Sequence, residues 1–257
     1  MNARFGTYHV LNWQKAELGG MSDALLATVQ AVAKCNCRAS PYLVANELIA
    51  GSIGRYLRLP VPPCCVADHD GIAYFMSLNF NLTGEALPPI IPSRFVADFP
   101  DLSAGVVAFD ALIANQDRHD KNIAAVTQDR DRKRACVFDH DRCLFGAQEG
   151  RGVELLQRVR RELVIDGALN RNRRPHCLLS ALKDDTGLHE WVSRIEGIPP
   201  WFIVETVVEA QFHARLTDAE KDAAITYLKD RQPVVRQLLR DGIENGAFPA
   251  LENRGLL

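Results

Sequence analysis

The sequence lacks the features that mark membrane, secreted and nucleic-acid-binding proteins. None of its apolar runs approaches the roughly 20 residues that a membrane-spanning helix needs, and residues 1–14 contain no long apolar stretch of the kind found in secretory signals. The 30 basic and 32 acidic residues leave a net charge of −2, whereas proteins that bind DNA or RNA usually have a basic surplus. We therefore expect no membrane association and no direct binding of nucleic acid.

A regular cysteine pattern is also missing. The seven cysteines are an odd number and are scattered along the chain, which argues against a disulfide framework. Cys35 with Cys37, and Cys64 with Cys65, could suggest a metal site, but no second pair follows at zinc-finger spacing. Structural thiols are the simpler interpretation. They indicate a reducing compartment, which we take to be the cytoplasm.

Residues 1–85 have the pattern of a small α/β unit. The β-compatible residues 25–34 predict one strand, and residues 72–80 predict another. Between them, Ser40-Pro41 has the form of an N-cap followed by proline at the first helical position. Small or apolar residues then recur at helical spacing as far as position 57, so we expect a helix that begins directly after Ser40.

The remainder, residues 86–257, is predicted to be mainly helical. A helix is expected over residues 102–114, and a β-hairpin with a polar turn follows it over residues 123–138. Thr217 and Glu220 have the spacing of a capping box. The apolar spacing beyond residue 151 predicts four more helices, at residues 153–164, 201–210, 218–228 and 234–239. Together the two parts predict an α+β fold.

Three side chains near the hairpin have the chemistry that phosphoryl transfer requires. This reaction needs a carboxylate that accepts or orients the hydroxyl proton, oxygen ligands for magnesium, and a cation on the phosphates. Asp117 follows the predicted helix on a loop, and Asn122 lies five residues later, which is the spacing of base and metal-binding Asn in kinase catalytic loops. Asp139, at the end of the hairpin, is a hard anionic ligand suited to magnesium. Taken singly, Asp117 could be a solvated loop acid and Asp139 a turn residue.

The run Asp117-Arg118-His119, followed by Asn122-Ile123, is similar to the catalytic loop of phosphatidylinositol kinases. Its surroundings resemble bacterial HipA-type serine/threonine kinases more closely, because residues 46–50, 59–62 and 109–115 resemble segments of that family in the same order. The resemblance covers most of the chain. It implies a two-lobed, protein-kinase-like fold with a small α/β N-lobe, residues 1–85, and a larger, mainly helical C-lobe, residues 86–257. It also implies ATP in the cleft, Asp117 as the catalytic base, and Asn122 and Asp139 on Mg²⁺.

The same resemblance suggests how the N-terminal part would hold ATP. Lys34 is the candidate for the lysine that contacts the phosphates, although a lone lysine on a strand could instead extend into solvent. Glu47 would pair with Lys34, and Gly20 and Ser22 would belong to a short glycine-containing loop at the nucleotide. His119 would orient the catalytic loop by hydrogen bonding, assist proton transfer, or merely fill space.

Arg118 is expected to pair with a nearby carboxylate, either Asp110 or Asp139. The predicted activity is an ATP- and Mg²⁺-dependent transfer of the γ-phosphoryl group to a hydroxyl, on a serine or threonine of a protein. The resemblance adds a toxin–antitoxin role with an antitoxin-like partner that binds DNA. Two alternatives remain: a degenerate kinase fold that regulates a partner, suggested by the short glycine region, and a kinase for small molecules.

Overall fold

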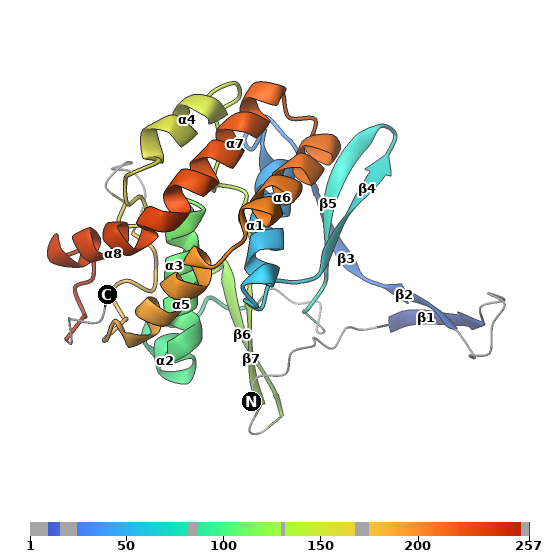
Figure 1. Ribbon diagram of the computed structural model, residues 1–257. Coiled ribbons are helices and arrows are strands. Elements are labelled where there is room, and N and C mark those ends of the chain that lie inside the picture. Colours follow the sequence, from blue (N-terminus) through green and yellow to red (C-terminus); the bar gives the residue numbers. More distant parts are fainter. Residues whose placement is uncertain (1–9, 16–24, 82–86, 130–131, 168–174, 253–256) are drawn as a thin grey trace.

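The computed structural model describes residues 10–15, 25–81, 87–129, 132–167, 175–252 and 257. It shows a mixed α+β protein in which the strands lie beside a group of packed helices (Figure 1). Within the described residues the strands form three small antiparallel sheets. No helix in this part of the chain is long and apolar enough to cross a membrane.

The first two sheets are formed by the N-terminal strands. Strands β1 (Val10–Lys15) and β2 (Leu25–Val29) pair only with each other within their sheet and project away from the helices (Figure 1). Strands β3 (Ala31–Cys35), β4 (Cys64–His69) and β5 (Ile72–Leu78) form a second sheet in the order β3-β5-β4.

The prediction of one strand over residues 25–34 was therefore wrong. The chain changes partners at Gln30, whose carbonyl and side-chain oxygens accept hydrogen bonds from Asn79 at 2.9 and 3.2 Å. Residues before Gln30 pair with β1, and residues after it pair with β5. Alternation along one segment indicates extended backbone but does not show where the pairing partner changes.

Helix α1 (Leu43–Tyr56) packs against β3, β5 and a later helix, α6 (Pro200–Ala214). It begins later than we predicted, with Tyr42 at the N-cap position. The Ser40 hydroxyl does not cap it but donates to Asp141 Oδ2 at 2.9 Å. Asn36 supplies the missing acceptor, since its Oδ1 accepts the Val44 N–H at 2.9 Å.

The centre of the molecule is formed by α3 (Pro100–Leu112), which is buried from Leu102 onwards. A short helix that we had not predicted, α2 (Pro92–Asp98), precedes it, and both helices begin with proline. After α3, strands β6 (Ile123–Asp129) and β7 (Arg132–Val137) form the predicted hairpin.

The rest of the chain is helical. Beside α6 it contains α4 (Gly152–Val159), α5 (Thr186–Glu196), α7 (Asp218–Arg231), a 3₁₀ turn (Gln232–Val234) and α8 (Val235–Glu244). Helix α5 was not predicted. The capping box is confirmed, because the Thr217 side chain accepts from the Glu220 N–H while the Glu220 side chain accepts from the Thr217 N–H.

Candidate active site

The loop that contains Asp117 begins with an abrupt end to α3. Ala114 has a left-handed φ of 50°, and this turn stops the helix. The next residue, Asn115, is buried and donates through Nδ2 to Asp110 Oδ1 at 3.0 Å, while its own Oδ1 accepts the Asp117 N–H at 3.1 Å. Asp117 is consequently held on the loop at a partly exposed position.

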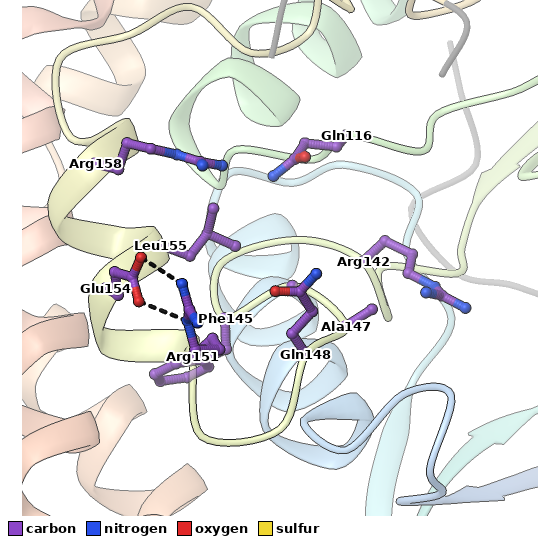
Figure 2. Close-up of a pocket in the computed structure, with 10 residues that line it drawn as sticks. Gln116, Arg142, Phe145, Ala147, Gln148, Arg151, Glu154, Leu155 and Arg158 are labelled. Carbon is purple, nitrogen blue, oxygen red and sulfur yellow. Dashed lines mark hydrogen bonds and ion pairs between the residues drawn. The ribbon is translucent and has the colours of Figure 1, made fainter. Parts of the chain in front are cut away.

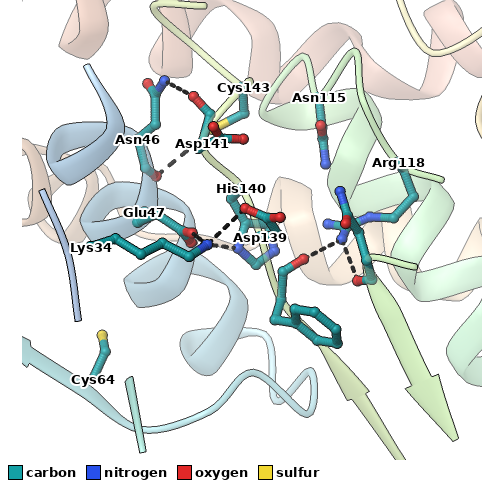
Figure 3. A network of polar contacts seen from close by, with 12 residues as sticks. Lys34, Asn46, Glu47, Cys64, Asn115, Arg118, Asp139, His140, Asp141 and Cys143 are labelled. Carbon is teal, nitrogen blue, oxygen red and sulfur yellow. Dashed lines mark hydrogen bonds and ion pairs between the residues drawn. The ribbon is translucent and has the colours of Figure 1, made fainter. Parts of the chain in front are cut away.

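Arg118 holds this loop against the neighbouring segments through buried hydrogen bonds. Its side chain is fully buried, and its Nε lies 2.7 Å from Asp110 Oδ2. Its Nη1 donates to the carbonyl oxygens of Asn122 at 2.8 Å and Phe138 at 2.6 Å, as Figure 3 shows in part. One guanidinium therefore joins the end of α3, the catalytic loop and the residue just before Asp139. Of the two carboxylates considered for Arg118, the structure selects Asp110.

Charge is stable at this buried pair. Burial favours the neutral form of each group, but the attraction between them outweighs it, so the pKa of Asp110 is held below its usual value and the pKa of Arg118 above its own. His176 Nε2 also lies 3.0 Å from Asp110 Oδ2. His176 was not predicted, since it is 66 residues from Asp110 and belongs to no motif. Only its burial beside the loop reveals it.

Asn122 and Asp139 have the donors that Mg²⁺ prefers. Asn122 Nδ2 donates to the Asp117 carbonyl at 3.0 Å, and no hydrogen bond to its Oδ1 is found within the described residues. Asp139 has a left-handed φ of 62°, a conformation that Asp tolerates and that recurs at functional sites. An amide oxygen and a carboxylate, together with substrate phosphates, fit a magnesium site.

Lys34 reaches this site from β3. Its Nζ donates to Glu47 Oε1 at 2.9 Å and to Asp139 Oδ1 at 2.8 Å (Figure 3). The expected contact with Glu47 is therefore present, and the contact with Asp139 spans 105 residues. Although burial opposes its charge, the carboxylates of Glu47 and Asp139 raise the pKa of Lys34 above its ordinary value.

Glu47 is almost fully buried, and His140 Nδ1 lies 3.2 Å from its Oε2. Burial alone would raise the pKa of Glu47, but the hydrogen bond and charge of His140, together with Lys34, lower it to about 2. The Glu47 carboxylate thus remains ionised over the whole neutral range and holds Lys34 in place.

The other predicted residues are less closely tied to this group. The side chain of His119 is 43% exposed, and its Nδ1 accepts the Lys121 N–H at 3.2 Å. This bond supports a role in loop conformation. Gly20 and Ser22 lie outside the described residues.

The cysteines show no sign of a metal centre. All seven are free thiols, and within the described residues no group of three His, Cys, Asp or Glu side chains could hold a metal ion. Burial raises the pKa of the Cys143 and Cys177 thiols, so both are protonated at neutral pH.

The fold resembles that of a solved kinase. The crystal structure of a proinflammatory kinase from Helicobacter pylori, CtkA, matches with a TM-score of 0.59 and 14% sequence identity, over 93% of this chain and 98% of that chain. The chain has a kinase-like fold. This confirms the α+β, kinase-like fold class that was expected, whereas the division into two lobes stays a prediction; at this identity the likeness extends to the fold and not to the substrate.

A second match is to HipA from Shewanella oneidensis MR-1, solved in a complex of HipA, HipB and operator DNA. Its TM-score is 0.48 and its identity 13%, over 86% of this chain and 62% of that chain. No family model matches the chain, and no curated protein matches it either.

Proposed function

We propose that the chain is an ATP- and Mg²⁺-dependent kinase that transfers the γ-phosphoryl group to a serine or threonine hydroxyl of a protein. The observation that carries the proposal is the meeting of Lys34 and Asp139 at 2.8 Å. It brings a cation suited to phosphates and a carboxylate suited to Mg²⁺ to one place, beside the loop that holds Asp117. In this proposal residues 1–85 form the smaller lobe and residues 86–257 the larger one.

Each residue has a distinct role in the proposed reaction. Asp117 orients the acceptor hydroxyl and accepts its proton, because it is a partly exposed carboxylate on the loop, five residues before Asn122. Asn122 and Asp139 would hold Mg²⁺, which supplies charge neutralisation at the phosphoryl oxygens when bound. Lys34 has three N–H donors, so it can keep its bond to Glu47 while it turns the others toward the phosphates.

The remaining assignments stay predictions. His119 keeps the conformation of the catalytic loop, as its bond with Lys121 suggests. Gly20 and Ser22 contact the nucleotide. A cytoplasmic location, an antitoxin-like partner and the absence of direct nucleic acid binding follow from the sequence and its family resemblance.

The test compares wild type with Asp117→Asn. Transfer of label from ATP to a mixture of serine- and threonine-containing peptides should fall by about 10²–10⁴-fold, the usual cost of losing a general base. Calorimetry with Mg-ATP serves as the control and should show equal affinity, since Asp117 is not a nucleotide ligand in the proposal. Equal transfer by the two proteins would refute the assignment. Correct folding without ATP binding would instead favour a regulatory, degenerate kinase.

A further inference from the structure

A pocket of about 510 Å³ lies beside the catalytic loop. Figure 2 shows that it is enclosed by the segment that follows Asp139 and by α4. Gln116, which directly precedes Asp117, also lines it. Successive Cα atoms are about 3.8 Å apart, so the backbone of the proposed base lies next to a residue that lines the pocket. Its polar lining is Gln116, Arg142, Gln148, Arg151, Glu154 and Arg158.

This lining is cationic although the chain as a whole has a net charge of −2. Three arginines face one carboxylate, that of Glu154. Arg151 pairs with Glu154, with 2.6 Å between Nε and Oε2, and Arg142 Nε lies 3.4 Å from Asp141 Oδ2, whereas Arg158 has no ion pair within the described residues. In Figure 2 the Arg158 side chain extends from α4 toward Gln116. Guanidinium groups bind carboxylates and phosphates through paired hydrogen bonds, so the pocket suits an anion.

The segment around Asp141, Phe145 and Gly146, which forms one wall of the pocket, is held in place by contacts with α1 and α4. The buried side chain of Asn46, on α1, donates to the Asp141 carbonyl at 2.8 Å and accepts the Phe145 N–H at 3.2 Å. Gly146 has a left-handed φ of 68°, and a Cβ at this position would lie 2.6 Å from Leu155 Cδ2. The wall is therefore built before any ligand arrives, which lowers the ordering cost of binding.

We propose that this pocket binds an anionic side chain, a carboxylate or a phosphate, of the acceptor peptide. This is the peptide whose serine or threonine hydroxyl is phosphorylated with Asp117 as the base. The acceptor hydroxyl must approach Asp117, while the anion is bound at Arg158, whose side chain extends toward Gln116 (Figure 2). One extended peptide can supply both groups, because its residues advance about 3.3 Å each. The term acceptor rests on the proposed kinase function; the binding of an anionic peptide does not.

The test measures binding directly, without nucleotide. Fluorescently labelled short peptides with a central serine carry one glutamate, one phosphoserine or one glutamine, placed in turn at each neighbouring position. Anisotropy with the full chain should show tighter binding of a glutamate or phosphoserine peptide than of its glutamine counterpart. Comparison of these two arms shows which anion is preferred. Arg158→Gln should weaken that binding by about tenfold, the lower end of what a charge-assisted hydrogen bond contributes.

Two further variants separate this role from a structural one. Glu154→Gln removes the carboxylate that competes for Arg151 and should strengthen anionic peptide binding, an effect that no loss of folding would produce. Arg161→Gln changes an exposed arginine outside the pocket and should leave binding unchanged. The proposal is overturned if no peptide binds, if the glutamine peptides bind equally, or if Arg161→Gln matches Arg158→Gln. Anionic binding combined with equal transfer by wild type and Asp117→Asn would refute the kinase assignment alone.

Discussion

The loop that contains Asp117 and the β1–β2 ribbon are held in contrasting ways. The loop rests on the buried group of Asp110, Arg118 and His176, whose contacts reach α3, the residue directly after β7 and the segment before α5. The ribbon has its two strands paired with each other, and large apolar side chains such as Trp13 and Leu25 are more than half exposed on it. The core therefore determines the position of the loop, whereas the pairing of β1 with β2 determines the conformation of the ribbon.

Lys34 lies between these two regions, the loop held by the core and the ribbon held by strand pairing. It belongs to the strand that follows the ribbon, but its charged end joins Glu47 and Asp139 in the body of the protein. The half of the site around Asp117 and Asn122 is held in its conformation by the buried group, before any ligand binds. The half that would hold the phosphates depends on one ion cluster, and substitutions should have effects of correspondingly different size.

The largest effect is expected at Arg118. Arg118→Met leaves the buried Asp110 carboxylate without its main partner and should lower the free energy of unfolding by about 3–5 kcal/mol, as measured by urea denaturation. Addition of Asp110→Asn should recover part of the loss, because it removes the uncompensated charge. As a control, Arg160→Met breaks an exposed pair with Asp230 of similar length, 2.8 Å, and should cost about 0–1 kcal/mol. Equal losses of stability at Arg118 and Arg160 would show that the buried ion pair contributes no more than the exposed one.

A smaller effect is expected at Glu47. Glu47→Gln removes the charge that holds Lys34 and should cost about 1.5–3 kcal/mol at neutral pH, as for a hydrogen bond between charged groups. Folding lowers the pKa of Glu47 from 4.5 to about 2, so its contribution is present above pH 4.5 and is lost as the pH falls toward 2.

Urea denaturation at several pH values checks this sign. The difference in stability between wild type and Glu47→Gln should be constant from neutral pH to about 5 and should shrink below 4.5. Asp110, whose pKa is also lowered, is present in both proteins and cancels. A gap that widened in acid would show that Glu47 is protonated in the folded protein.

The smallest effect is expected in the ribbon. Trp13 is 58% exposed, and Trp13→Ser should change the free energy of unfolding by less than about 0.5 kcal/mol, as is usual for surface substitutions. A loss of about 2 kcal/mol, the amount expected for a large apolar side chain that is fully buried, would mean that the ribbon packs against other surface in solution.

Much of the site could be predicted because its residues are close in sequence. Asp117, Arg118 and Asn122 follow one another between a helix and a hairpin, so residue type and spacing sufficed to predict the loop that contains them. The hairpin and the capping box at Thr217 were predicted for the same local reason. The start of α1 was not, because the Ser40 hydroxyl binds Asp141 and an acceptor from Asn36 takes its place.

By itself, the sequence determined which residue types the loop contains, and its resemblance predicted the kinase-like fold. Tertiary structure alone decided that Arg118 pairs with Asp110, that His176 joins them, and that Lys34 touches Asp139. His176 and Asp110 are 66 residues apart and Lys34 and Asp139 are 105 apart, and the spacing of residues along the chain contains no information on which distant segments meet. They are selected in the folded core, where each buried charge or donor must find a partner.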